Sequence, residues 1–185
     1  MSFPSAFPRV PVRSAVAPSD IATAIEFVNR VNWLFETWDV ESMVQSFTPD
    51  AVAFHFHGTI RGEEEIRRFF EQDYPYLVPG VGRHATNHIV DADGEGVQVR
   101  YHNLLVRHAW PEDAKALGAG EVMESTSLPA FWLYSPMRDR LRRTAGGWKI
   151  HERHIGGSTT RAAFNPVDAS VAAIAPHLPR VAVQP

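Results

Sequence analysis

The sequence predicts an α+β fold in which helices cover one face of a strongly curved, mixed or antiparallel sheet. Two observations carry this prediction. Apolar residues recur every three or four positions between residues 19 and 37, which is helical spacing, and most of the chain from residue 51 to 157 alternates between apolar and polar residues like β-strands. Helices followed by a run of antiparallel strands gather on one face of the sheet. A bent sheet around the long first helix would form a cone with a pocket at its mouth.

A long helix is predicted from residue 19 to about 37, with Ser19 as its N-cap, because serine is among the favoured capping residues. Its apolar face consists of Ile21, Ala24, Ile25, Val28, Val31, Leu34 and Phe35. The stretch DVESMVQSF predicts a second, shorter helix that Asp39 caps and that TPD ends. At least one broad helix face is therefore buried against the sheet.

The strands follow in order. AVAFHFHG (51–58) alternates as a strand, and GEEEIRRFFEQDYPYL (62–77) predicts a helix with a charged, solvated face. Longer strands are expected at 83–93, 96–110, 128–143 and 146–156, with turns near 93–96 and 145–147. The basic stretch RDRLRR (138–143) is interpreted as a surface patch near a hairpin tip.

We expect one domain, because a single core can serve 185 residues. Residues 1–18 form an irregular arm that four prolines interrupt, 19–157 form the domain, and 158–185 form a weakly helical extension. The segment 112–127 has no periodicity and is a candidate cover for the pocket. No apolar run reaches the length of a membrane span, and the N-terminus lacks the apolar stretch of a secretory signal, so we expect a cytoplasmic protein.

Composition excludes several function classes. A formal net charge of −3 gives no basic surface for nucleic acid, which leaves small molecules as expected partners. The absence of cysteine excludes disulfides, thiol nucleophiles and cysteine-ligated zinc. No glycine-rich dinucleotide motif and no Gly-x-Ser-x-Gly motif occur in a suitable context.

Histidines are the most informative residue type. The chain has 9 of them, and those on predicted strands have parities that can share one concave face: His55, His57, His84, His102 and His108. Glu36, at the end of the long helix, could point into the same volume. Imidazole and carboxylate groups together perform general acid–base catalysis near neutral pH, and this chemistry needs no cofactor. For each single histidine, a hydrogen-bonded structural role is the alternative.

A metal site is the other interpretation of these histidines. His55 and His57 are two residues apart on a strand and could chelate one ion, with a third ligand from His84 or His108. The sequence has no His-Glu-x-x-His helix and no cluster of acids, so we expect no metal. Candidate pocket-lining residues, for which core packing is the alternative, are Trp33, Phe35, Tyr74, Phe131 and Trp132.

The order of elements, with WDVESMVQSFTPDAVAFHFHGTIRGEEEIRRFF leading and GGWKIHERHI closing, resembles the nuclear transport factor 2-like superfamily and in particular its SnoaL-like enzymes. RHATNHI and YHNLLVRHAW are most similar to scytalone dehydratases. The resemblance implies a cone-shaped α+β barrel, catalytic histidines at His84 and His108, a catalytic carboxylate at Glu36 and a pocket position at His55. It also implies a homo-oligomer, a dimer or trimer formed through the outer sheet face.

These observations predict a cofactor-independent enzyme that dehydrates, isomerises or cyclises a small hydrophobic or aromatic substrate of polyketide or terpenoid type. His84, His108 and Glu36 would be catalytic, and His55, His57 and His102 would join the aromatic residues in binding the substrate. Two alternatives remain. One is a non-catalytic ligand-binding or scaffold module, and the other is an epoxide hydrolase with two acids flanking an arginine, for which Arg100, Asp91 and Asp93 are the nearest set.

Overall fold

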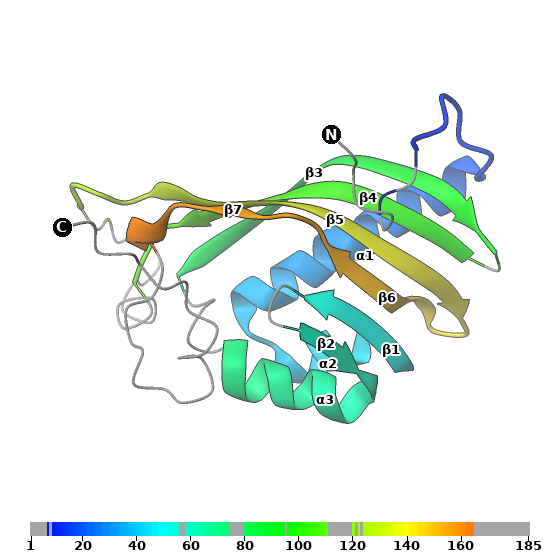
Figure 1. Cartoon of the computed structure of the whole chain (residues 1–185), viewed down its shortest axis with the longest axis horizontal. Helices are drawn as coiled ribbons and strands as arrows, with labels where there is room; N and C mark the ends of the chain where they lie inside the picture. The colour runs from blue at the N-terminus through cyan, green and yellow to red at the C-terminus, as the bar shows by residue number, and fades with distance from the viewer. Residues whose placement is uncertain are drawn as a thin grey trace.

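The computed structural model describes residues 7, 9–55, 58–74, 80–94, 96–110, 120, 122 and 124–164. Its elements form the predicted α+β arrangement, in which short helical segments and strands follow one long N-terminal helix (Figure 1). In chain order they are α1 (Pro18–Thr37), α2 (Val40–Gln45), β1 (Phe47–His55), β2 (Gly58–Arg61), α3 (Gly62–Arg68), η1 (Phe69–Asp73), β3 (Val81–Asp93), β4 (Gly96–Arg107), β5 (Ala130–Thr144), β6 (Gly147–Ile155), β7 (Thr159–Thr160) and η3 (Ala162–Phe164).

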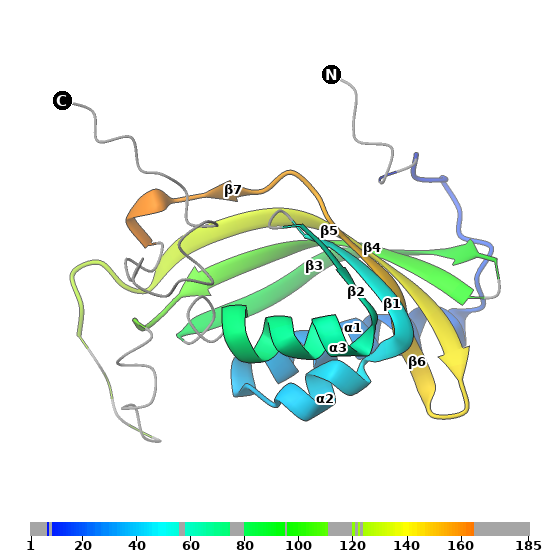
Figure 2. The same ribbon diagram turned by 60° about the horizontal axis from the view of Figure 1, so that its bottom comes forward.

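The described strands form one mixed sheet in the order β2-β1-β6-β5-β4-β3, and β7 pairs with β5. β1 and β6 run parallel, and the other paired strands run antiparallel. The sheet is strongly curved but does not close, because β2 and β3 remain as its two edges (Figures 1 and 2). The predicted fold class is therefore confirmed as an open, cone-like sheet.

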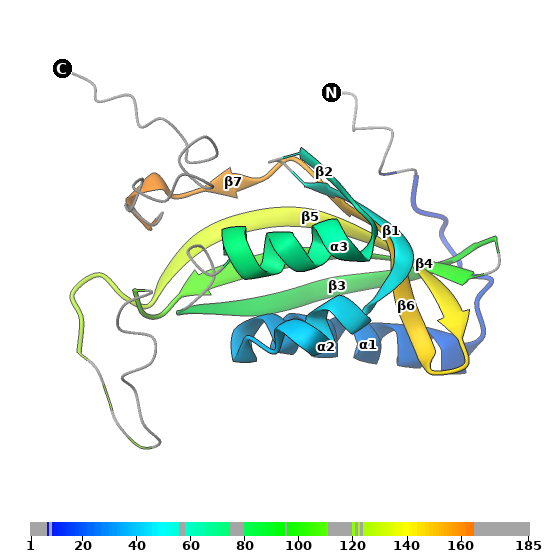
Figure 3. The same ribbon diagram turned by 90° about the horizontal axis from the view of Figure 1, so that it is seen from below.

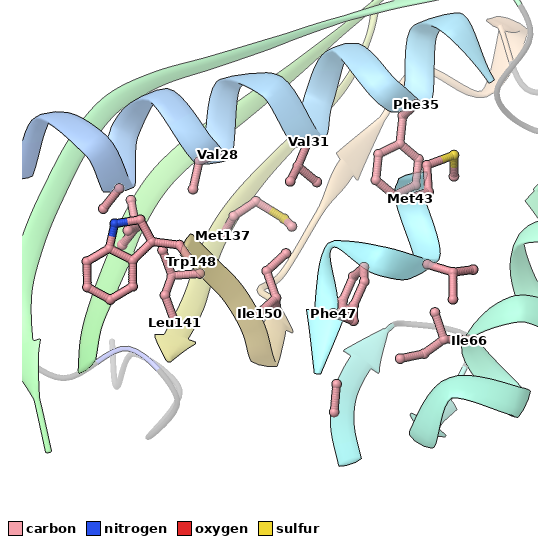
Figure 4. Close-up of a cluster of buried hydrophobic side chains, with 14 of the residues drawn as sticks. Val28, Val31, Phe35, Met43, Phe47, Ile66, Met137, Leu141, Trp148 and Ile150 are labelled. Carbon is pink, nitrogen blue, oxygen red and sulfur yellow. The ribbon is translucent and has the colours of Figure 1, made fainter. Parts of the chain in front are cut away.

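The helices lie on the concave side of the sheet, where α1 and α3 flank the strands seen between them (Figure 3). Val28, Val31 and Phe35 of α1 point toward the core (Figure 4). Their partners in this buried cluster include Met43, Phe47, Ile66, Met137, Leu141, Trp148 and Ile150. Burial of these apolar side chains is the main force that holds the helices against the sheet.

The first helix starts one residue before the predicted cap. Pro18 occupies the first turn, and Ala17 stands at the N-cap without a side-chain hydrogen bond, so the prediction of Ser19 as the cap is wrong. Proline suits this place because its fixed φ is helical and its missing N–H would have had no partner. The prediction for Asp39 is confirmed, because its Oδ1 accepts a hydrogen bond of 3.0 Å from the backbone N–H of Ser42.

An irregularity in β3 decides which of its side chains face the helices. Asn87 has a φ of 56°, and the pairing with β4 shifts between Thr86 and Ile89. Such a bulge reverses the alternation of side chains in the residues that follow it. Arg83, before the bulge, contacts core rings on the concave side, and so does His88 after it. His84 and His88 therefore lie on opposite faces, although residues four apart in a regular strand share one face.

Parts of the predicted organisation lie outside the described residues. These parts are residues 1–6 and 8 of the N-terminal arm, most of the segment 112–127 and the extension after residue 164. The sheet itself continues past residue 157, because Leu133 and Tyr134 of β5 pair with the short strand β7. No helix of the described residues is long and apolar enough to cross a membrane.

Candidate functional site

A buried polar network lies on the concave side of the sheet. Asp139 on β5 is fully buried, and its carboxylate accepts hydrogen bonds of 2.7 Å from both Nε and Nη2 of Arg153 on β6. The hydroxyl of Tyr101 on β4 donates a third hydrogen bond of 2.9 Å to the same carboxylate. Three adjacent strands thus bring an acid, a guanidinium and a phenol together beneath the helices. We call these three residues the Asp139 network.

The network has a defined protonation state. Burial raises the pKa of the Tyr101 phenol far above its ordinary value, and the positive charges of Arg153 and Arg83 act in the opposite direction without reversing this effect. Burial is the largest influence on Arg153 and lowers its pKa, but the charge and hydrogen bonds of Asp139, together with smaller contributions from Tyr101 and Tyr74, raise the pKa of the guanidinium above its ordinary value. Tyr101 therefore stays protonated and Arg153 stays charged, so the phenol donates its hydrogen bond to the carboxylate.

His88 on β3 is the histidine next to this network. Its ring stacks on the Tyr101 ring, with a centroid separation of 5.6 Å and an interplanar angle of 21°. Burial lowers the pKa of His88 below 6.5, which favours the neutral imidazole near pH 7. Its Nε2 is buried and finds no hydrogen-bond partner among the described residues. A neutral imidazole with an unpaired nitrogen can accept or donate a proton.

Glu36 lies at the edge of the sheet near the end of α1. Its Oε1 accepts a hydrogen bond of 2.6 Å from the backbone N–H of Arg83, on the free edge of β3. The guanidinium of Arg83 lies over two core rings, 4.7 Å from the centroid of Phe35 and 5.7 Å from that of Tyr74. Glu36 thus lies beside the cation of Arg83 and an aromatic cluster. The sequence predicts its side chain on this concave side.

His55 belongs to the same aromatic cluster. Its ring meets the edge or face of Phe69 at 5.2 Å and of Tyr74 at 6.1 Å. Phe35 and Tyr74, both predicted as lining residues, are buried in this cluster with their centroids 5.5 Å apart. The structure therefore brings together Glu36, His55, Phe35 and Tyr74 of the predicted site residues.

The shared concave face predicted for the strand histidines is wrong for His84 and His102. His84 is exposed on the face opposite Arg83, and His102 contacts Tyr134 on that outer face, at a centroid distance of 5.3 Å. His108 is exposed just after the end of β4, where its backbone N–H donates to the carbonyl of Gly80. Catalysis by His84 and His108 stays a prediction, which their placement does not favour. His57 lies outside the described residues.

The remaining predicted lining residues lie apart from the Asp139 network. Trp33 is 65% exposed and Phe131 is 50% exposed, so neither contributes to the core. Trp132 is buried in a second apolar cluster, where the fully buried Arg107 lies over its ring at 4.5 Å. These three residues do not join Phe35 and Tyr74.

Two charge patterns of the sequence analysis can be placed in the sheet. Arg100 pairs with Asp91 on the outer face, so this set does not build the acid–arginine–acid arrangement of an epoxide hydrolase inside the cone. RDRLRR lies in the last part of β5, next to the hairpin turn at which Thr144 pairs with Gly147 of β6, as predicted. Arg140 and Arg142 do form surface-side ion pairs, but Asp139 within the stretch is fully buried, so the interpretation as a surface patch is wrong for this residue.

The sequence reasoning missed the Asp139 network and His88, although one signal was present. Asp139 stands between Met137 and Leu141, at the parity that is buried in β5. Tyr101 likewise continues the buried series of Val97 and Val99 in β4. A charged residue at a buried strand position requires a partner and is therefore a candidate for function.

The described residues contain no group of three or more histidine, aspartate or glutamate side chains placed to hold a metal ion. The side chains of the described interior can themselves support proton transfer and hydrogen bonding. Its acid–base groups are Glu36, His55, His88, Tyr101 and Asp139.

Comparisons with known proteins extend this description. No curated protein sequence matches the chain. Solved structures match as folds: a protein of Nostoc punctiforme with a cystatin-like fold has 19% identity and a TM-score of 0.60, over 76% of this chain and 92% of that one. A candidate scytalone dehydratase of Novosphingobium aromaticivorans has 14% identity and a TM-score of 0.57, over 77% of this chain and 88% of that one. The model of the SnoaL-like domain matches residues 18–154, and the chain therefore belongs to the SnoaL-like domain family.

Proposed function

We propose that the protein is a cofactor-independent enzyme that removes and returns a proton on a small hydrophobic or aromatic ketone, with His88 as the general base. The observation that carries this proposal is the unpaired Nε2 of His88 beside Tyr101 on the concave side. A buried polar atom without a partner destabilises the fold by about 1–3 kcal/mol. A protein can retain this loss of stability where a ligand or reacting group forms the missing hydrogen bond.

The Asp139 network gives His88 a fixed position. Arg153 and Tyr101 satisfy the carboxylate of Asp139, and this holds the Tyr101 ring on which the imidazole stacks. Burial lowers the pKa of the imidazole, which favours its neutral form near pH 7. A base with a pKa near or below the working pH is free to accept a proton, and this contributes about 10² to 10⁴ in rate.

Dehydration of a β-hydroxyketone illustrates the chemistry. His88 removes a proton from the carbon between the carbonyl and the hydroxyl-bearing carbon, and the electron pair moves to the carbonyl oxygen as an enolate. The enolate then re-forms the carbonyl and expels the hydroxyl group, which takes the proton from the imidazolium and leaves as water. The histidine ends neutral, so no cofactor is consumed. Glu36 and His55 are proposed to orient the substrate within the aromatic cluster.

The test uses 3-hydroxy-1-tetralone, which loses water to give fluorescent 1-naphthol. We expect His88→Gln to lower kcat/KM for this probe by about 10²-fold or more, because a general base is lost. His84→Gln is the matched variant, four residues away on the outer face. If His84→Gln or His108→Gln abolishes turnover and His88→Gln does not, the assignment made from the family resemblance replaces ours.

A binding module is the alternative outcome of the same experiment. In that case 1-naphthol forms no faster with the wild-type protein than in buffer, while the probe still binds. The partner we propose is thus a small hydrophobic molecule in either case.

We also propose that the chain forms a homodimer or homotrimer. Sedimentation equilibrium measures the mass of the assembly directly, and the mass of a single chain would contradict this proposal.

A further inference from the structure

An arginine beside the proposed site has a guanidinium that no acid neutralises. Arg83 forms no ion pair with any described residue, although its backbone N–H is bound by Glu36. Arg153, by contrast, is paired with Asp139. A partly buried guanidinium without a counter-ion is costly, because it loses part of its hydration without regaining hydrogen bonds.

The nitrogen atoms of the Arg83 guanidinium differ in their exposure to solvent. Nε is buried and has no hydrogen-bond partner among the described residues. The two Nη groups are not buried and donate no hydrogen bond to the described residues, so they are accessible to solvent. The guanidinium therefore has free donors, one of them already stripped of water.

The surroundings of this guanidinium are aromatic. It lies over Phe35 and Tyr74, rings that are 3% and 8% exposed and belong to the main buried cluster. Contact with two rings attracts the cation and restricts its position, and the guanidinium itself is a rigid planar fork of N–H groups. A carboxylate matches this fork with two parallel hydrogen bonds, which a hydroxyl or carbonyl cannot do.

The charge of Arg83 also reaches the proposed catalytic region. It opposes the effect of burial on the pKa of Tyr101, the residue on which His88 stacks. Arg83, Tyr101 and His88 therefore lie on the same, concave side of the sheet. Glu36 is the nearby negative charge, but its Oε1 is bound to the backbone of Arg83 rather than to the guanidinium.

We infer that Arg83 binds the carboxylate of a planar, aromatic substrate acid. This inference deepens the proposed function, on which it rests for the location of the site. It defines the substrate class as an aromatic carboxylic acid whose carboxylate meets the accessible Nη groups of Arg83.

The experiment compares two ligands of nearly equal shape, 2-naphthoate and 2-naphthamide, by isothermal titration calorimetry at low ionic strength. The wild-type protein should bind 2-naphthoate about tenfold or more tightly than 2-naphthamide, because charge-assisted hydrogen bonds are the stronger ones. Arg83→Gln should remove this preference and leave the affinity for 2-naphthamide unchanged. Arg83→Lys should keep part of it, because the charge remains and the fork is lost.

The outcomes separate the two proposals. Equal affinities of the wild-type protein for the two ligands, or a preference that persists in Arg83→Gln, would overturn the inference while the proposed function stands. Failure of the wild-type protein to bind either ligand would contradict both. Circular dichroism of each variant, together with unchanged binding of 2-naphthamide, excludes misfolding as the cause of a lost preference.

Discussion

Replacement of Asp139 by asparagine tests the energetic importance of the polar network. Asp139→Asn keeps the size of the side chain but removes the charge that pairs with Arg153, whose side chain is only 10% exposed. The two hydrogen bonds of 2.7 Å that Arg153 donates to the carboxylate lose their negatively charged acceptor. A buried ion pair that loses one partner destabilises a protein by about 3–5 kcal/mol, because the other charge remains buried. We therefore expect this loss in the free energy of unfolding.

Urea unfolding at pH 7, followed by tryptophan fluorescence and circular dichroism, measures this loss. Tyr101→Phe is the graded companion, because it keeps the ion pair and removes the 2.9 Å hydrogen bond to Asp139 together with the longer one, 3.4 Å, that the hydroxyl accepts from Arg153. It should cost about 1.5–3 kcal/mol. The double variant Asp139→Leu with Arg153→Met removes both charges and should recover much of the stability lost in Asp139→Asn. An Asp139→Asn protein within about 1 kcal/mol of the wild type would refute the network as described, since that loss is below the range for a broken buried pair.

Three further predictions concern the histidine, the bulge and the core. Burial lowers the pKa of His88 below 6.5, so the unfolded chain binds its proton more readily, and stability should fall as the pH drops below about 6.5. Urea midpoints at pH 8 and 5.5 should differ less in His88→Gln than in the wild type, with His151 contributing in the same direction, and an unchanged difference would contradict this. Asn87→Val should cost about 1–3 kcal/mol, whereas Asn87→Gly should be tolerated, because the φ of 56° disfavours a β-branched residue; equal unfolding free energies would refute the strain. Phe35→Ala should cost about 3–5 kcal/mol, whereas Trp33→Ala, at a 65% exposed position on the same helix, should change the unfolding free energy by less than about 0.5 kcal/mol.

The fold could be predicted from the sequence because it depends on local periodicity. The helical spacing of residues 19–37 and the strand alternation after residue 51 each report the buried face of one element. The family resemblance adds the order of the strands, which periodicity does not contain. The prediction of the N-cap failed for a local reason, because the helix already begins at Pro18, one residue before Ser19.

The candidate site was predicted less well, because it depends on which face each strand residue occupies. His102 lies at the parity opposite Val97, Val99 and Tyr101, the buried series of β4. Counting by twos along β3 from His84 assumes a regular strand, and the bulge at Asn87 breaks that assumption. It moves His88 to the concave side while His84 stays outside. Asp139 is interpreted from sequence as part of a basic surface stretch because arginines surround it. Its position between the buried residues Met137 and Leu141 distinguishes it from those arginines.

The arginine that we assign to substrate binding could not be identified from sequence. Arg83 is one of 18 lysine and arginine residues, and nothing in its neighbours shows that it lacks an ion pair. Only the tertiary structure brings it over Tyr74, which precedes β3, and over Phe35 of the distant helix α1. Charge pairing is a property of the folded chain.

The central claim is that small aromatic ligands meet His88 on the concave side of the sheet, not the histidines of the outer face. The imidazole ¹H–¹³C spectrum of the histidines tests it most directly, with signals assigned from His88→Gln and His84→Gln and with 2-naphthamide as the added ligand. Our account predicts that the Cε1–Hε1 signal of His88 shifts on titration while that of His84 does not. A shift of the His84 signal with that of His88 unmoved would contradict it.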